Sequence, residues 1–263
     1  MKLFIELTKR AFQRQMSYRA ATLAGLMTNF FFGLLRAAVL IALYGERQEV
    51  AGVTLQGAIT FTGLTQAVIA FLSLFRWTDL MDSVYSGAVG SDLLKPMNYY
   101  TYWLAQDLGR ASAALITRGI TIMLAFAVAI GITTPDSLGQ WLALGVAIFL
   151  SWLVSFSWRF IVNLFSFWTP NAYGIARFIF ILSWAFSGFF MPLRFYPDWY
   201  IALAKLTPFP AMVNTLVEIY LGVLTGPQML AALAQQAIWV LVLFAIGQVL
   251  LRFGVRRLVI LGG

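Results

Sequence analysis

Several polar side chains stand inside long apolar runs of this chain, where they could form a path for a solute through a membrane. Arg36 is the only charge well within such a run, and Asn29 precedes it by about two helical turns. A charge in lipid costs about 2.5–3.5 kcal/mol on insertion scales, so Arg36 should face protein or water. It would then line the path or attract an anionic group. Alternatively, it snorkels outward or pairs with Glu46 or Glu49.

Hydroxyl and amide groups recur at helical spacing in other apolar runs. Thr62 and Gln66 share one helical face, and Ser183 and Ser187 share another. Such stripes either hydrogen-bond neighbouring helices or contact a solute, and joining helices is the simpler role. Two further sets are expected to join helices: Ser151, Ser155, Arg159 and Asn163; and Gly25, Asn29 and Gly33. The candidates for a substrate path are Asn29, Arg36, Thr62, Gln66, Ser183 and Ser187.

The sequence lacks the groups that most enzymes use. It has no histidine and no cysteine, which removes a Ser-His base, thiol chemistry and disulfides, and its ten carboxylates show no pair spaced like a metal or acid–base site. No G-x-x-x-x-G-K-[ST] pattern occurs, so the chain cannot hold ATP in a P-loop. We place every acidic residue in a loop or near a helix end, which counts against a proton relay. A transporter with this sequence would need an external motor.

The connection 76–110 is the longest on its side of the apolar runs, and loops of this length usually have a function. Gly87, Gly90 and Pro96 divide it into two short helices, followed by aromatic residues at 99–103 that could sit at a membrane interface. The helices carry Asp79, Asp82, Asp92 and Lys95. Exposed, they would suit docking to a soluble subunit; alternatively, the connection only returns the chain to the membrane.

Six long apolar blocks must position these residues, and we predict that each is a membrane-spanning helix. The blocks are 21–44, 57–75, 111–132, 139–163, 173–191 and 229–251. A bilayer core about 30 Å thick needs about 20 apolar residues of helix, and each crossing must satisfy its own backbone. The 263 residues are 61% hydrophobic and 11% charged, which leaves no room for a large soluble domain. We therefore expect 1–263 to form one all-α membrane domain.

The basic residues lie mostly on one side of these blocks. On that side are Lys2, Lys9, Arg10, Arg14, Arg19, Arg76, Lys95, Arg110, Arg118, Arg159, Arg177, Arg252, Arg256 and Arg257, whereas the other side has only Arg47, Arg194 and Lys205. Positive residues stay in the cytoplasm, so both termini and 76–110 are predicted to be cytoplasmic, in a cell (inner) membrane. This topology explains the net charge of +8 better than a nucleic-acid partner does.

Two flanking segments complete the expected architecture. The arm 1–20 is amphipathic, with Phe4, Leu7 and Ala11 on one face, and should lie among the inner headgroups of the membrane lipid. The outer segment 192–222 is apolar but contains four prolines, which prevent a full-length helix. We expect short interfacial or re-entrant helices there, shaping the outer mouth.

Three groups of residues are similar to a known family. The first comprises Ser86-Gly87, Leu93-Leu94-Lys95-Pro96, Asn98-Tyr99 and Tyr102-Trp103. The second comprises Phe167-Trp168, Gly174-Ile175, Ser187-Gly188, Pro192-Leu193 and the run from Phe195 to Trp199. The third comprises Pro208-Phe209 and the run from Ile219 to Gly222. In order and spacing, these groups resemble the signatures of type-2 ABC exporter permeases, in their short six-helix form.

The resemblance implies a membrane subunit of an ATP-driven exporter. Two permeases, commonly different chains, would pair above two ABC ATPase subunits, which hold the ATP and magnesium; no cofactor is expected in this chain. The arm 1–20 would be an elbow helix, 192–222 a re-entrant element, and 76–110 would hold the coupling helix that contacts the ATPase. The residues implied at that contact are Asp79, Asp82, Gly87, Leu94, Lys95 and Pro96. The family has no catalytic residue to transfer.

Two other functions stay open from the residues alone. A membrane-embedded lipid-modifying enzyme would need acidic, Ser or Tyr groups converging at one depth, and the sequence offers no obvious set. A non-transporting membrane scaffold would leave cargo distribution unchanged after its deletion. The sequence leaves the cargo open, and does not decide whether the second permease is a sister chain or a copy of this one.

Overall fold

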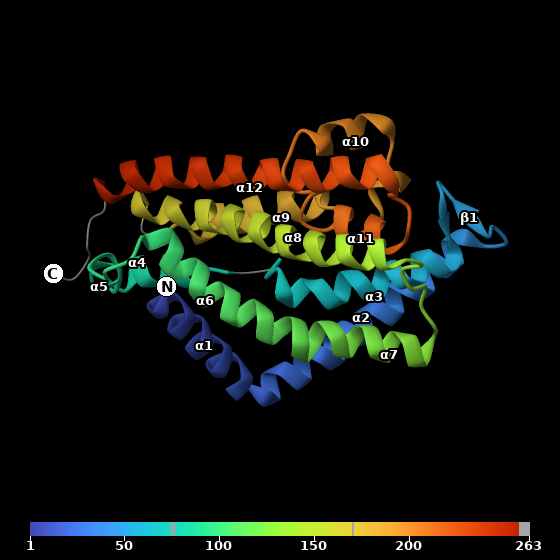
Figure 1. Cartoon of the computed structure of the whole chain (residues 1–263), viewed down its shortest axis with the longest axis horizontal. Helices are drawn as coiled ribbons and strands as arrows, with labels where there is room; N and C mark the ends of the chain where they lie inside the picture. The colour runs from blue at the N-terminus through green and yellow to red at the C-terminus, as the bar shows by residue number, and fades with distance from the viewer. Residues whose placement is uncertain (75–76, 170, 258–263) are drawn as a thin grey trace.

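The computed structural model describes residues 1–74, 77–169 and 171–257, and long helices dominate it. These helices run roughly along the longest axis of the molecule (Figure 1). At one end lie the short helices α4 (Asp79–Tyr85) and α5 (Val89–Leu93), with the start of α1 and the end of α12. At the other end lies a hairpin of β1 (Glu49–Val50) and β2 (Val53–Thr54), in which Glu49 pairs with Thr54.

In the part of the chain that the structure describes, four helices are long and apolar enough to cross a membrane. They are α2 (Arg19–Tyr44), the continuous helix Tyr99–Ala129, α8 (Leu138–Leu164) and α12 (Gly226–Val255). The second of these consists of α6 (Tyr99–Ala114), a π-helical turn η1 (Leu115–Ile120) and α7 (Thr121–Ala129). Leu138–Phe167 extends α8 by η2 (Phe165–Phe167). The all-α membrane class is confirmed at this level.

The other two predicted crossings are shorter than expected. They are α3 (Leu55–Phe71), with 17 residues, and α9 (Tyr173–Phe186), with 14. At 1.5 Å per residue they extend about 26 Å and about 21 Å, less than the about 30 Å of a bilayer core. After α3 the backbone turns at Ser73, which has φ +50°, and after α9 it turns at Gly188, with φ +76°. The predicted end of the second crossing, at residue 75, lies outside the described residues.

Polar side chains from other helices close both of these early helix ends. Arg110 donates hydrogen bonds to the carbonyls of Ala70 and Phe71, and Ser155 donates one to the carbonyl of Leu72. At the end of α9, Arg36 donates to the carbonyls of Phe189 and Phe190. Non-helical backbone at membrane depth needs partners of this kind, because lipid supplies none. The sequence alone does not show which side chain reaches which carbonyl.

The third crossing begins earlier than 111. The side chain of Asn98 accepts hydrogen bonds from the amides of Tyr100 and Thr101 and so caps a helix that starts at Tyr99. Residues 99–110 are therefore helical rather than part of a loop. The aromatic side chains in this stretch are buried among Trp77, Phe156, Phe160 and Phe167. They are part of the hydrophobic core, whereas the sequence predicted them at a membrane interface.

Glycines let helices approach closely. A Cβ at Gly109 of α6 would lie 2.1 Å from the carbonyl oxygen of Thr8 in α1 (Lys2–Ser17), so only glycine fits where the arm crosses this helix. A Cβ at Gly33 of α2 would lie 2.6 Å from the ring of Phe126 in α7, and one at Gly25 would lie 2.5 Å from the guanidinium of Arg118. The predicted small-residue packing face on α2 is confirmed.

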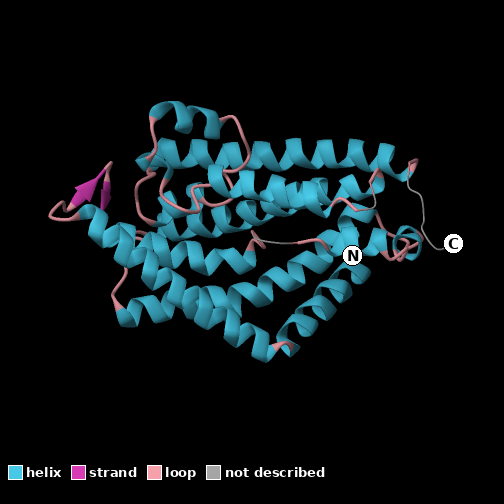
Figure 2. Ribbon diagram, turned by 180° about the vertical axis from the view of Figure 1, so that it is seen from behind, coloured by secondary structure: helices cyan, strands magenta, loops and turns pink. Residues whose placement is uncertain are grey.

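The outer segment contains the short helices that its prolines predicted. They are η3 (Leu193–Phe195), α10 (Asp198–Lys205) and α11 (Asn214–Tyr220). Leu216, Val217 and Ile219 of α11 are buried, and α11 packs against α8, whereas α10 stands apart at the edge of the molecule (Figure 2). In this segment α11 is therefore part of the core, whereas α10 lies at the surface.

Candidate functional site

Helices α4 and α5 form a compact unit at one end of the molecule. A left-handed turn at Gly87, with φ +76°, joins them and suits glycine. Asp79, Asp82 and Pro96 are exposed, and Leu94, at 86%, is among the most exposed apolar side chains of the described residues. Arg76, where the predicted coupling region begins, lies outside the described residues. Four of the six predicted coupling residues thus face outward on this unit.

Asp92 holds the unit together from inside. Its carboxylate accepts hydrogen bonds from the Ser83 hydroxyl at 2.6 Å and from the Lys95 ammonium at 2.5 Å. Lys95 also donates to the Tyr102 hydroxyl at 2.7 Å, at the start of α6. Partial burial acts to lower the pKa of Lys95, but the bonds to Asp92 and Tyr102 outweigh it, and the pKa is raised above its ordinary value. Lys95 is therefore engaged within the chain, where sequence reasoning expected it at the contact with a partner.

The unit is also bonded to α8 and α9. The amide of Met81 donates to the side-chain oxygen of Asn163 in α8, and the side-chain nitrogen of Asn163 donates to the carbonyl of Trp77. The Tyr173 hydroxyl, at the start of α9, donates to Asp82 at 2.6 Å. A displacement of α4 would therefore act directly on α8 and α9.

A buried ion cluster joins α6 to α8, and the sequence alone did not predict it. Asp107 of α6 is fully buried and accepts a two-pronged contact from Arg159 of α8, at 3.0 and 2.9 Å. Arg110 and the Trp152 indole nitrogen also donate to Asp107. The prediction that every acidic residue lies in a loop or near a helix end was wrong for Asp107. The i, i+3 spacing of Asp107 and Arg110, with the Asn98 cap, is the signal that could have placed it in a helix.

Arg36 stands at the junction of three helices. Its guanidinium donates to the Thr65 hydroxyl of α3 at 3.1 Å and to the carbonyls after α9 at 2.6 and 2.8 Å, and it lies over the Phe189 ring at 5.0 Å. Among the described residues it forms no ion pair with Glu46 or Glu49. The guanidinium thus supplies donors to the non-helical backbone that follows α9.

A family model described as "ABC-2 family transporter protein" matches residues 30–262. This chain belongs to the ABC-2 transporter family. Membership makes it a multi-pass membrane permease component of an ABC transporter, as the signature residues predicted. None of the curated proteins matches it.

The other residues predicted for a substrate path in this ABC-2 permease are mostly buried. Thr62, Gln66, Ser183 and Ser187 lie inside the chain, and three of them donate to carbonyls of their own helix: Thr62 to Ile59, Ser183 to Phe180, and Ser187 to Trp184. The structure brings Arg36 and α3 together but leaves Asn29 in a separate pocket. Contact of these residues with a solute stays a prediction.

The polar stripe on α8 of the ABC-2 permease joins elements as expected. Ser151 and Gln236 of α12 both donate to the carbonyl of Ala211, and Gln236 also donates to Ser151 at 3.0 Å. Ser155, Arg159 and Asn163 continue the stripe through the contacts described above. Hydrogen bonds from this side of α8 therefore reach both the segment 192–222 and the unit of α4 and α5.

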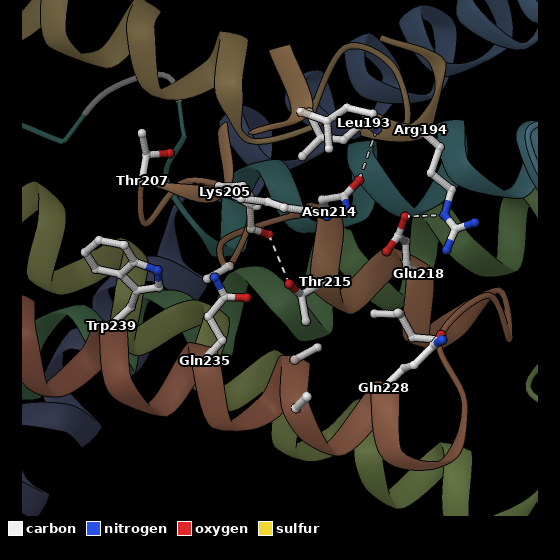
Figure 3. Close-up of a pocket in the computed structure, with 16 residues that line it drawn as sticks. Leu193, Arg194, Lys205, Thr207, Asn214, Thr215, Glu218, Gln228, Gln235 and Trp239 are labelled. Carbon is white, nitrogen blue, oxygen red and sulfur yellow. Dashed lines mark hydrogen bonds and ion pairs between the residues drawn. The ribbon is translucent and has the colours of Figure 1, made fainter. Parts of the chain in front are cut away.

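A polar pocket of about 510 Å³ lies between the outer segment and α12 of the permease (Figure 3). The ion pair of Arg194 and Glu218, at 2.7 Å, forms one side, and Lys205 and Gln235 lie on the other. Trp239 also lines the pocket.

Proposed function

We propose that this ABC-2 permease belongs to an ATP-driven exporter and that α4 and α5 dock on a separate ABC ATPase. The unit of α4 and α5 carries this proposal. It exposes Leu94 and Pro96 at one end of the molecule while hydrogen bonds tie it to α6, α8 and α9. An exposed apolar tip on a braced element is what a docking contact requires.

In the proposed assembly the chain crosses the membrane six times, with α3 and α9 as the two short crossings. Both termini face the cytoplasm of a cell whose inner membrane holds the complex, and α1 lies along the inner surface as an elbow helix. The chain pairs with a second permease, a sister chain or a copy of itself. ATP and magnesium bind on the ATPase subunits. ATP-driven closure would bias the pair between inward-facing and outward-facing states.

Helix α9 offers a route from the docking unit to the membrane interior. Asp82 holds its first residue, Tyr173, and Arg36 holds the carbonyls that follow its last turn. If docking moved α4, α9 would shift between these two anchors. The Arg36 contacts to Phe189 and Phe190 would then be made or broken, which gives Arg36 a role in switching the path as well as in lining it.

We expect that an affinity-tagged chain retrieves a P-loop ABC ATPase from its native membranes and that Leu94→Asp reduces the retained ATPase about tenfold. The substitution places a charge in the centre of the proposed contact, where about 1.4 kcal/mol corresponds to tenfold. Mass spectrometry of the retained proteins measures the effect.

The matched control is Leu206→Asp, because Leu206 is also exposed (76%) but lies in the outer segment. This variant should retain the ATPase in full. Equal retention by Leu94→Asp and the wild type would show that the ATPase, if any, docks elsewhere.

A further inference from the structure

A second pocket, of about 280 Å³, lies where the end of α1, the first half of α2 and the end of α3 meet. Gln15 of α1, Asn29 of α2, Ser73 after α3, Arg110 of α6 and Arg118 of η1 line it. Five segments thus bring five polar side chains to one cavity, two of them guanidinium groups. Cavities inside a helical membrane domain are seldom so polar unless they bind something.

The charge of Arg118 is not neutralised within the described part of the chain. Its guanidinium donates one hydrogen bond, to the carbonyl of Ala21 at 3.0 Å, and no carboxylate among the described residues lies within ion-pair distance. Arg110 shares its single carboxylate partner, Asp107, with Arg159. The wall formed by α6 and η1 therefore carries excess positive charge.

Local backbone structure and a glycine place the Arg118 guanidinium. Arg118 lies within the π-helical turn η1, and such turns interrupt α-helices mainly at functional sites. Gly25 leaves room for the guanidinium, since a Cβ there would lie 2.5 Å from its central carbon. In addition, the side-chain nitrogen of Asn29 is buried and has no hydrogen-bond acceptor in the described part of the chain. Asn29 thus offers this pocket a hydrogen-bond donor that has no partner among the described residues, in addition to the two guanidinium groups.

The depth of the pocket indicates which anion it would meet. Arg118 contacts the carbonyl of Ala21, within the first turn of α2, and the pocket also reaches Gln15 at the end of the amphipathic helix α1. A basic pocket at the end of a crossing, beside an interfacial helix, lies at the level of lipid headgroups. We propose that this pocket binds the phosphate of an anionic phospholipid from the leaflet next to α4 and α5.

The test uses the full chain in detergent and native mass spectrometry, with phosphatidylglycerol as the probe. Arg118→Gln should weaken phosphatidylglycerol binding about tenfold, because it removes a charge-assisted hydrogen bond. Gly25→Ala should also weaken it, since the new methyl group displaces the guanidinium while the charge remains. Both variants should keep the melting temperature of the wild type, because the Arg118 side chain donates only one hydrogen bond within the described residues.

The matched control is Arg177→Gln, which removes an exposed charge near the same end of the molecule, at the start of α9. It should leave phosphatidylglycerol binding unchanged. An equal loss in Arg177→Gln and Arg118→Gln would overturn the site, because general surface charge would then explain the binding. Excess inorganic phosphate should not displace the lipid; full displacement would assign the pocket to a soluble phosphate and overturn the lipid assignment.

Discussion

Asp107→Ala will lower the free energy of unfolding by about 3–5 kcal/mol, the typical cost of leaving a buried charge without its partner. Arg159 is only 2% exposed and forms both of its guanidinium contacts to a carboxylate with Asp107, so the substitution leaves its charge uncompensated in the core. Arg110 and Trp152 lose the same acceptor. Unfolding by SDS in mixed micelles measures the change.

Two further variants separate the buried cluster from a general effect of charge. Glu6→Ala removes an exposed carboxylate from an i, i+4 pair with Arg10 and should cost less than about 0.5 kcal/mol. Asp107→Ala combined with Arg159→Met should be more stable than Asp107→Ala alone, because the unpaired charge is then absent. If the Asp107→Ala variant were as stable as the wild type, the buried cluster would not stabilise the fold as we infer.

Asp92→Ala will increase amide hydrogen exchange across residues 79–98 by about thirtyfold. Asp92 accepts from Ser83 and from Lys95, and we assign about 1 kcal/mol to each contact because Lys95 is partly exposed. About 2 kcal/mol lost from local stability corresponds to about thirtyfold faster opening. Hydrogen exchange of the protein in micelles, followed by mass spectrometry, measures the exchange rate of each peptide within 79–98.

Ser91→Ala serves as the control for this substitution. Ser91 is exposed in the same helix and donates only to the carbonyl of Ala88. Exchange in 79–98 should stay near that of the wild type. If Asp92→Ala left the exchange of 79–98 unchanged, α4 and α5 would not be the braced unit that transmission of force requires.

The long helices could be predicted from hydropathy because their length and composition are properties of the chain itself. α2, α8 and α12 begin and end within a few residues of the predicted blocks. The two short glycine- and proline-bounded helices in 76–110 were also predicted, since Gly87 and Pro96 are local signals. The match to the ABC-2 family agrees with the signature residues, whose first group lies within and just after this pair of helices.

The early ends of α3 and α9 could not be predicted in the same way. Both segments stay apolar past their last helical turn, so hydropathy extended them to 75 and 191. What ends them is tertiary: Arg110 reaches the last carbonyls of α3, Ser155 reaches the next one, and Arg36 reaches the carbonyls that follow α9. These side chains come from helices remote in sequence. The same limit hid Asp107, whose partner Arg159 is supplied by α8.

Accessibility of single cysteines from the two sides of the membrane tests the central assignment most directly, since the natural chain has none. We predict that an impermeant maleimide labels Leu94→Cys only in inside-out vesicles and that bound ATPase slows this reaction, whereas Leu206→Cys reacts only from outside intact cells. Labelling of Leu94→Cys from outside intact cells, or at the same rate with and without the ATPase, would contradict a cytoplasmic docking unit.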